Sequence, residues 1–201
     1  MSGKIKAYDF DGTLIAGDSF ILFPIHALSP VRLVCAILKS IPTLIKWKLL
    51  GLIDASIAKE KIFFNLYHGL PFDRMRQKAE SFINILDRRI ITSVIDTLPP
   101  ADTADTSVIV SASPSFWILP WAKHHGFDDV IATEAEIKDG ILTGRFSTPN
   151  CKGEEKVRRL QMRFPDLESR SIEAWGDSID DIPMLGLAET PHFVLKANQQ
   201  G

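Results

Sequence analysis

Three short apolar runs have the pattern of strands that lie buried in a parallel sheet. They are "KIKAYDF" (4–10), "TSVIVSAS" (106–113) and "SIEAWGDS" (171–178), and each ends in polar residues. β-Branched and aromatic residues fill these runs, which is typical of strands. Three further stretches have helical patterns and lie between or after the later strands: 115–127, 153–164 and 180–188. This alternation predicts an α/β fold, with a parallel sheet and helical crossovers.

Residues 19–98 have a different pattern, with periodic apolar positions and almost no strand signal. The stretches 56–70 and 71–86 each place apolar residues three and four positions apart, as helices do. We therefore predict a helical cap at 19–98, inserted into a core made of 1–18 and 99–201. Within that core, 131–146 has the pattern of a β-hairpin that turns at Asp139 and Gly140.

Composition and charge narrow the possible partners only slightly. The 201 residues are 45% hydrophobic, enough to bury a sizeable core in one domain or in a domain plus a small insertion. A formal net charge of -2 gives no positive field around the protein, so we expect no nucleic-acid partner. The sequence favours no particular oligomeric state. With two cysteines, Cys35 and Cys151, and no signal-peptide pattern at its start, the chain is expected in the cytoplasm.

Two carboxylates, Asp9 and Asp11, lie at the C-terminal end of the first predicted strand. Open parallel sheets place ligand-handling residues at this end of their strands. A phosphate dianion repels a carboxylate, so such a site needs a cation, and Asp9 with Asp177 can hold Mg²⁺. Asp9 is then the candidate nucleophile. Asp11 points to the same side of the extended chain and is the candidate acid and base.

Donors for the phosphoryl oxygens are expected at the end of the second strand. Ser111 offers a hydroxyl, and the backbone amides of Phe10, Ala112 and Ser113 are further candidates. Positive charge would come from one of two lysines, Lys152 or Lys156, which lie four residues apart on a predicted helix and can share one face.

Four motifs in order carry a family resemblance: "DFDGTL", "VSAS" with Ser111, "CKGEEK" and "GDSIDD". They resemble the motifs of the haloacid dehalogenase superfamily. The "SASP", "TGR" and "NCKGEEKV" stretches are similar to its subfamily IB, which includes phosphoserine phosphatases. The resemblance implies a Rossmann-like sheet flanked by helices, an inserted helical cap, Mg²⁺ dependence and an aspartyl-phosphate intermediate.

The resemblance also implies roles for individual residues. The metal site expected from it consists of four carboxylates: Asp9, Asp11, Asp177 and Asp181. Asp181, with Asp180, would orient metal-bound water or the lysine. For the lysine that contacts the phosphoryl group, phosphoserine phosphatases resemble this chain best at Lys152, whereas other subfamily relatives resemble it best at Lys156. We favour Lys156 for this role. Asp18 falls where phosphoserine phosphatases bind the substrate's ammonium group.

The predicted function is Mg²⁺-dependent hydrolysis of a phosphomonoester. A phosphoserine or other small-metabolite phosphatase is one alternative, and a phosphotransferase or a catalytically silent binding module is another. The substrate clue is the cap: between Asp18 and Asp54 the charged residues are all basic. They are Arg32, Lys39, Lys46 and Lys48. This favours a lipid-linked or amphiphilic phosphate, with peripheral contact at the inner face of a membrane.

Other features of the sequence carry weaker expectations. The segment 31–53 has too many charges for a membrane span, and Pro42 should kink or split its helix. In the alternative to membrane contact, its apolar face packs in the core and its lysines lie in water. Trp117 and Trp121 are expected in the core. His124 and His125 are not expected to share a metal, because neighbours on a helix point apart.

Overall fold

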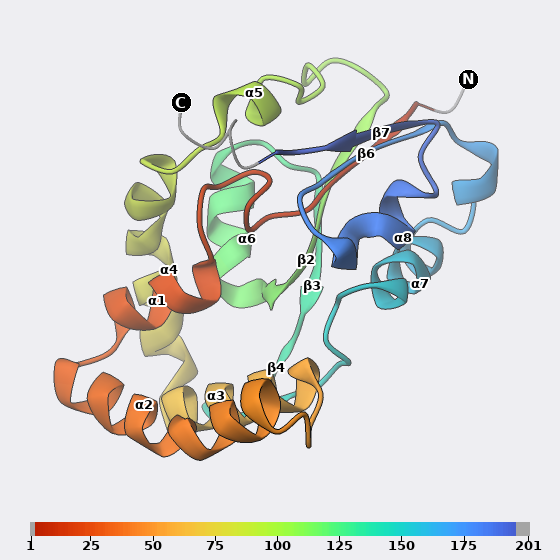
Figure 1. Ribbon diagram of the computed structural model, residues 1–201. Helices are drawn as coiled ribbons and strands as arrows, with labels where there is room; N and C mark the ends of the chain where they lie inside the picture. The colour runs from red at the N-terminus through yellow and green to blue at the C-terminus, as the bar shows by residue number, and fades with distance from the viewer. Residues whose placement is uncertain (1–2, 196–201) are drawn as a thin grey trace.

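A computed structural model describes residues 3–195 of the protein, and its centre is a five-stranded parallel sheet (Figure 1). The strands lie in the order β3-β2-β1-β6-β7. Their bounds are β1 Ile5–Tyr8, β2 Thr106–Pro114, β3 Asp129–Thr133, β6 Ile172–Gly176 and β7 Thr190–Phe193. Tyr8 at the end of β1 is level with Ile109 on one side and Trp175 on the other. The loops that follow β1, β2 and β6 therefore leave the same edge of the sheet, and the predicted α/β class is confirmed.

Helices cover both faces of this sheet, because successive side chains of each strand point to opposite sides. Val108 and Val110 pack on one side with α7 (Glu154–Arg163) and α8 (Ile182–Leu185). Ile109, on the other side, belongs to a larger apolar cluster that contains Trp117 and Trp121 of α6 (Ser115–His124). Both tryptophans are fully buried, as predicted. Short 3-10 turns complete this part of the chain: Leu167–Ser169 and Ile179–Asp181.

A helical insertion, α1–α5, connects β1 to β2. Its helices are α1 Ser19–Ala27, α2 Pro30–Leu44, α3 Ala55–Tyr67, α4 Phe72–Asp87 and α5 Thr92–Ile95. Asp18, Ser29 and Asp54 cap the first three, each accepting a hydrogen bond from a backbone amide of the first turn. The insertion shares its core with α6, since the ring of Phe23 stacks on that of Trp117 at 4.7 Å. The division into 1–18 with 99–201 and 19–98 stays a prediction.

The hairpin turns where it was expected but is shorter. Its strands are β4 (Ala135–Lys138) and β5 (Ile141–Phe146), and Asp139 and Gly140 between them both have positive φ. Residues 131–133 belong to β3 of the main sheet instead. The hairpin packs on the helical insertion: Gly69 N donates to Leu142 O, and a side chain at Gly144 would lie 2.8 Å from Phe64 Cα. The hairpin β4-β5 is thus a separate two-stranded sheet that packs on the helical insertion.

Helix α2 includes Pro42, and the expected kink there stays a prediction. Its apolar face, in contrast, is exposed. The helix passes Pro42 and continues to Leu44, where a π-helical turn, Ile45–Leu49, follows. Val34, Leu38 and Ile41 are 55%, 59% and 43% exposed, whereas the buried face holds small side chains. The alternative in which this apolar face packs in the core is therefore wrong. Among the helices of residues 3–195, none has both the length and the apolar character that a bilayer span requires.

Candidate active site

Three carboxylates meet at the edge of the sheet where β1 and β6 end. Asp9 directly follows β1 and Asp177 follows β6, while Asp181 lies in the next turn of chain. Each offers a carboxylate oxygen, and these oxygens lie within 4.8 Å of one another. Such a set of hard oxygen donors fits Mg²⁺, which prefers carboxylates and water. The structure thus brings together three of the four residues that the sequence predicts as metal ligands.

Lys156 of α7 lies against this cluster. Its Nζ is 2.6 Å from Asp9 Oδ1 and 2.6 Å from Asp181 Oδ1, and its side chain is buried. Burial acts to lower the pKa of Lys156, but the two carboxylates outweigh it and raise the pKa above its ordinary value. Lys152 instead lies 3.4 Å from Asp180 and is partly exposed. Of the two candidate lysines, only Lys156 contacts the carboxylate cluster.

Asp181 is held rigidly by the chain around it. Its Oδ2 accepts hydrogen bonds from Asp177 N, Ser178 N and Ser178 Oγ, so its Oδ1 is turned to Lys156.

The carboxylate of Asp177 lies so close to the backbone at Gly12 that only glycine fits there. An added Cβ would lie 2.2 Å from Asp177 Oδ2, and φ is +87°. The glycine of "DFDGT" is thus required both by the turn and by the carboxylate packed against it.

Asp11 lies beside the cluster in a hydrogen-bond network of its own. Its Oδ2 accepts from Ser113 Oγ at 2.5 Å and its Oδ1 from Ser19 N at 2.6 Å. Ser19 Oγ in turn donates to Ser113 Oγ and accepts from Trp117 Nε1. The carboxylate of Asp11 is not one of the three that converge. Its role as a metal ligand stays a prediction.

Burial raises the pKa of both aspartates that follow β1. The pKa of Asp9 rises to about 7: burial is the largest cause, Lys156 opposes it and the charge of Asp181 adds to it. The pKa of Asp11 rises to about 6, through burial and then the charge of Asp18, against the hydrogen bonds from Ser113 and others. A carboxyl group with a pKa near 6 can both give and take a proton near neutral pH.

The remaining candidates lie in β2, after β1 and at the start of α1. Ser111 is buried, and its Oγ accepts a hydrogen bond from Ser113 N at 3.0 Å. Phe10 is buried, with its ring 5.2 Å from that of Trp121. Asp18 is exposed and accepts a hydrogen bond from the amide of Phe20 at the start of α1. Its proposed contact with a substrate stays a prediction.

Sequence reasoning missed Lys59, which reaches this site from α3. Its Nζ donates to Ala112 O at 2.8 Å. Burial lowers the pKa of Lys59, opposed most by the charges of Asp11 and Asp18. No motif surrounds Lys59, and a lysine in an amphipathic helix usually faces solvent. Only the packing of the helical insertion against β2 places it here.

The parallel sheet and the carboxylate cluster at its edge define an α/β enzyme. More specifically, the chain belongs to the haloacid dehalogenase-like hydrolase family, whose sequence model matches residues 7–186. The protein CicA of Caulobacter vibrioides is 32% identical over 190 residues, which cover 92% of this chain and 83% of CicA. The resemblance seen in the four motifs is thus confirmed.

Solved structures share the fold. A protein of unknown function from Bordetella pertussis Tohama I superposes with a TM-score of 0.73 and 24% identity, covering 92% of this chain and 87% of that one. A phosphoserine phosphatase, captured as an analogue of its phospho-aspartyl intermediate, superposes with a TM-score of 0.58 and 19% identity. The match covers 94% of this chain and 84% of that one. The Rossmann-like architecture expected from the sequence is thereby confirmed.

Proposed function

We propose that the protein is a Mg²⁺-dependent phosphomonoester hydrolase that works through an aspartyl phosphate formed on Asp9. The observation that supports this most directly is the buried Lys156, whose Nζ is 2.6 Å from both Asp9 and Asp181 beside Asp177. A buried cation next to clustered carboxylates suits a dianionic group, whose charge must be matched in the reaction. Family membership and the phosphatases among the structural neighbours agree with this assignment.

Three carboxylates would hold the metal: Asp9, Asp177 and Asp181. When bound, Mg²⁺ supplies positive charge between the nucleophile and the phosphate. The free oxygen of Asp9 attacks phosphorus while the bond to the leaving oxygen breaks, and Asp11 gives that oxygen a proton. Water then attacks the same phosphorus and returns its proton to Asp11. This second step releases inorganic phosphate and restores the Asp9 carboxylate.

Other groups would bind the phosphoryl oxygens without exchanging protons. We assign the positive charge that contacts the phosphoryl group to Lys156 rather than Lys152, because Lys156 is buried beside Asp9. The hydroxyl of Ser111 and the amides near it would donate to the equatorial oxygens. Lys59 adds a second cation on the side of the helical insertion, where the charges of Asp9 and Asp11 act on it.

Removing the metal tests the reaction class. We expect hydrolysis of p-nitrophenyl phosphate in millimolar Mg²⁺, loss of activity to background in EDTA, and recovery when Mg²⁺ is restored. Inorganic phosphate should equal p-nitrophenol even with acceptor alcohols present, since a phosphotransferase would release less phosphate. Undiminished turnover in EDTA would contradict the metal assignment, and no turnover with any monoester would favour a binding module.

For the substrate, we propose an amphiphilic phosphate carried by an anionic lipid surface. The supporting observation is an apolar stripe that faces solvent along α2 and into the first residue of the π-helical turn after it, and we call it the α2 stripe. It comprises Val31, Val34, Leu38, Ile41 and Ile45, which are 43–75% exposed. These positions repeat every three or four residues, so they form one continuous helical face. Ordinary surfaces expose such residues singly, whereas gathered apolar residues mark an interaction site.

Charge beside the α2 stripe favours an anionic membrane as its partner. Lys39, Lys46 and Lys48 are exposed next to it, and each lysine near anionic lipid contributes about 1 kcal/mol. Arg32 is occupied differently, because its guanidinium donates to the carbonyls of Leu66 and His68. A helix with an apolar face beside lysines is the pattern of interfacial segments.

Liposome flotation tests the α2 stripe. The protein should float with anionic vesicles more than with neutral ones. A double variant, Leu38→Ser with Ile41→Ser, should bind at least ~10-fold more weakly, because burying one such side chain contributes about 1.5–3 kcal/mol. Met162→Ser is the matched control, since Met162 is 67% exposed on α7, outside the stripe.

The outcomes of this test distinguish membrane binding by the α2 stripe from phosphatase activity. All three proteins should hydrolyse p-nitrophenyl phosphate at the same rate. The lipid proposal is wrong if the wild type floats with neither vesicle, or if Met162→Ser loses as much binding as the double variant. It is also wrong if the protein is a dimer in solution that the double variant converts to monomers, because the stripe would then be an interface between copies.

A further inference from the structure

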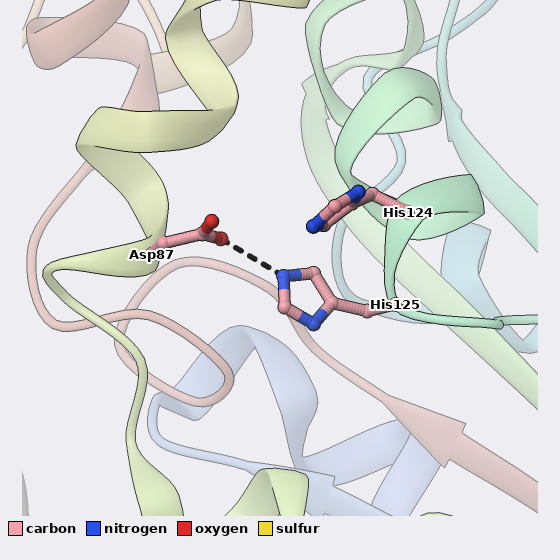
Figure 2. Close-up of side chains that lie close together, drawn as sticks. All are labelled: Asp87, His124 and His125. Atoms are coloured by element: carbon pink, nitrogen blue, oxygen red, sulfur yellow. Dashed lines mark hydrogen bonds and ion pairs between the residues drawn. The ribbon is translucent and has the colours of Figure 1, made fainter.

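We propose that Asp87, His124 and His125 form a second cation site, separate from the carboxylate cluster, that binds Zn²⁺ or a similar transition metal (Figure 2). Each residue offers one ligand atom, and these atoms lie within 4.8 Å of one another. Two imidazole nitrogens with one carboxylate suit Zn²⁺ rather than Mg²⁺, which prefers oxygen ligands alone. The two sites of the protein would thus select different metals.

The two histidines share this site because they stand where α6 ends. His124 is the last residue of the helix, and His125 is its C-cap. The premise that neighbouring histidines point apart does not hold at this helix end, because both offer a ligand atom within 4.8 Å of the Asp87 carboxylate. Figure 2 shows both rings on the side that faces the carboxylate of Asp87. The planes of the two rings are 86° apart, and their centroids are 5.0 Å apart.

Asp87 is oriented for this role by a buried neighbour. Its Oδ1 accepts a hydrogen bond from Trp121 Nε1 at 3.0 Å and lies 2.8 Å from His125 Nε2. Trp121 is fully buried, so its indole fixes the carboxylate. Hydrogen bonds of this kind, from groups behind the ligands, are what orient carboxylates and imidazoles in metal sites. Metal binding would replace the proton shared between Asp87 and His125.

Only small side-chain movements separate these positions from a tetrahedral site. With Zn–N and Zn–O distances near 2.0–2.1 Å, ligand atoms lie roughly 3.3 Å apart. The Asp87–His125 contact must widen slightly, and His124 must approach. His124 is exposed, and no residue in the range 3–195 restrains it by a hydrogen bond. The fourth position stays open to water.

An ion pair between Asp87 and His125 is the simpler alternative. A histidine at a helix C-terminus interacts favourably with the helix dipole, and Asp87 adds an opposite charge. This explains His125 but gives no reason for the ring of His124 to lie on the same side. A metal would also join α4 of the helical insertion to α6, since Asp87 comes from one and the histidines from the other.

Zinc titration by calorimetry tests the site in the full chain, with excess Mg²⁺ present to occupy the carboxylate cluster. We expect the wild type to bind one Zn²⁺ that is lost, or weakened ~10–100-fold, in His124→Gln and in Asp87→Asn. Lys123→Gln is the matched control, because Lys123 is exposed on the same helical turn and lies outside the cluster. Zn²⁺ should also raise the melting temperature of the wild type but not of His124→Gln.

Two results would overturn the proposal: no zinc binding by the wild type above Mg²⁺, or affinity in His124→Gln within about twofold of the wild type. His124→Gln removes an exposed side chain, so its melting temperature without zinc and its hydrolysis of p-nitrophenyl phosphate should match the wild type. These two measurements show that the variant is folded, so that lost zinc binding is due to the lost ligand.

Discussion

Replacing Asp9 with Asn should lower the rate of p-nitrophenyl phosphate hydrolysis by on the order of 10⁴–10⁶-fold, the scale seen when a covalent nucleophile is removed. An amide oxygen is a poor nucleophile and cannot form an acyl phosphate. It is also a weaker ligand for a divalent cation than a carboxylate. The substitution therefore removes both functions that we propose for Asp9.

The fold should tolerate this change, so that a loss of activity can be attributed to the lost carboxylate. An Asn oxygen can still accept the hydrogen bond from Lys156, whose charge also remains paired with Asp181 at 2.6 Å. Melting curves of Asp9→Asn and the wild type should show both proteins folded at the assay temperature. Asp166→Asn, at an exposed turn, is the matched control and should keep full activity. If Asp9→Asn retains more than about a tenth of wild-type activity, Asp9 is not the nucleophile.

The positions of Asp9, Ser111 and Asp177 could be predicted from the sequence because each lies at or near the C-terminal end of a strand that is recognisable by itself. Parallel strands end at one edge of the sheet, so residues far apart in the chain meet there. The structure places all three around that edge. This part of the site depends on local pattern and on topology, both of which the sequence carries.

Contacts made by tertiary packing could not be predicted. The sequence pattern places Lys152 and Lys156 on one face of a predicted helix, but α7 begins at Glu154, so Lys152 lies before the helix and only Lys156 is on it. Spacing alone did not show which of the two is buried. Ser19 and Trp117 belong to the network around Asp11, but they come from two helices whose relative placement no motif indicates. Lys59 reaches Ala112 for the same reason. For Ser19, Trp117 and Lys59 the missing information was the packing of the helical insertion against β2 and α6, and for Lys156 it was the packing of α7 against the carboxylates.

Periodicity also predicts that a helix has an apolar face without saying what covers it. In α2 the face with Leu38 and Ile41 lies in solvent, while Ala36 and Ser40 are buried. Small side chains let α2 pack closely on its neighbours and leave its larger residues outside. The rings of His124 and His125 lie closer together than expected, because the rule for neighbours inside a helix does not apply at a helix end.

The surroundings of Asp11 explain how it could serve in both steps of hydrolysis. The acid must be protonated when the leaving oxygen departs and ionised when water attacks. A pKa of about 6 leaves both forms populated near neutral pH, whereas an ordinary aspartate would be ionised almost completely. Hydrogen bonds from Ser113 and Ser19 fix the carboxylate in place for both transfers.

Replacing Asp11 with Asn should therefore lower turnover of p-nitrophenyl phosphate by ~10²–10⁴-fold and make the phosphoenzyme accumulate. p-Nitrophenolate leaves without a proton, so formation of the aspartyl phosphate should suffer less than its hydrolysis, which needs a base. Intact-mass spectrometry of acid-quenched Asp11→Asn should detect the added phosphoryl group, and Asp9→Asn, treated identically, should show none. If Asp11→Asn turns over at the wild-type rate, or slows without accumulating phosphoenzyme, Asp11 is not the base that activates water.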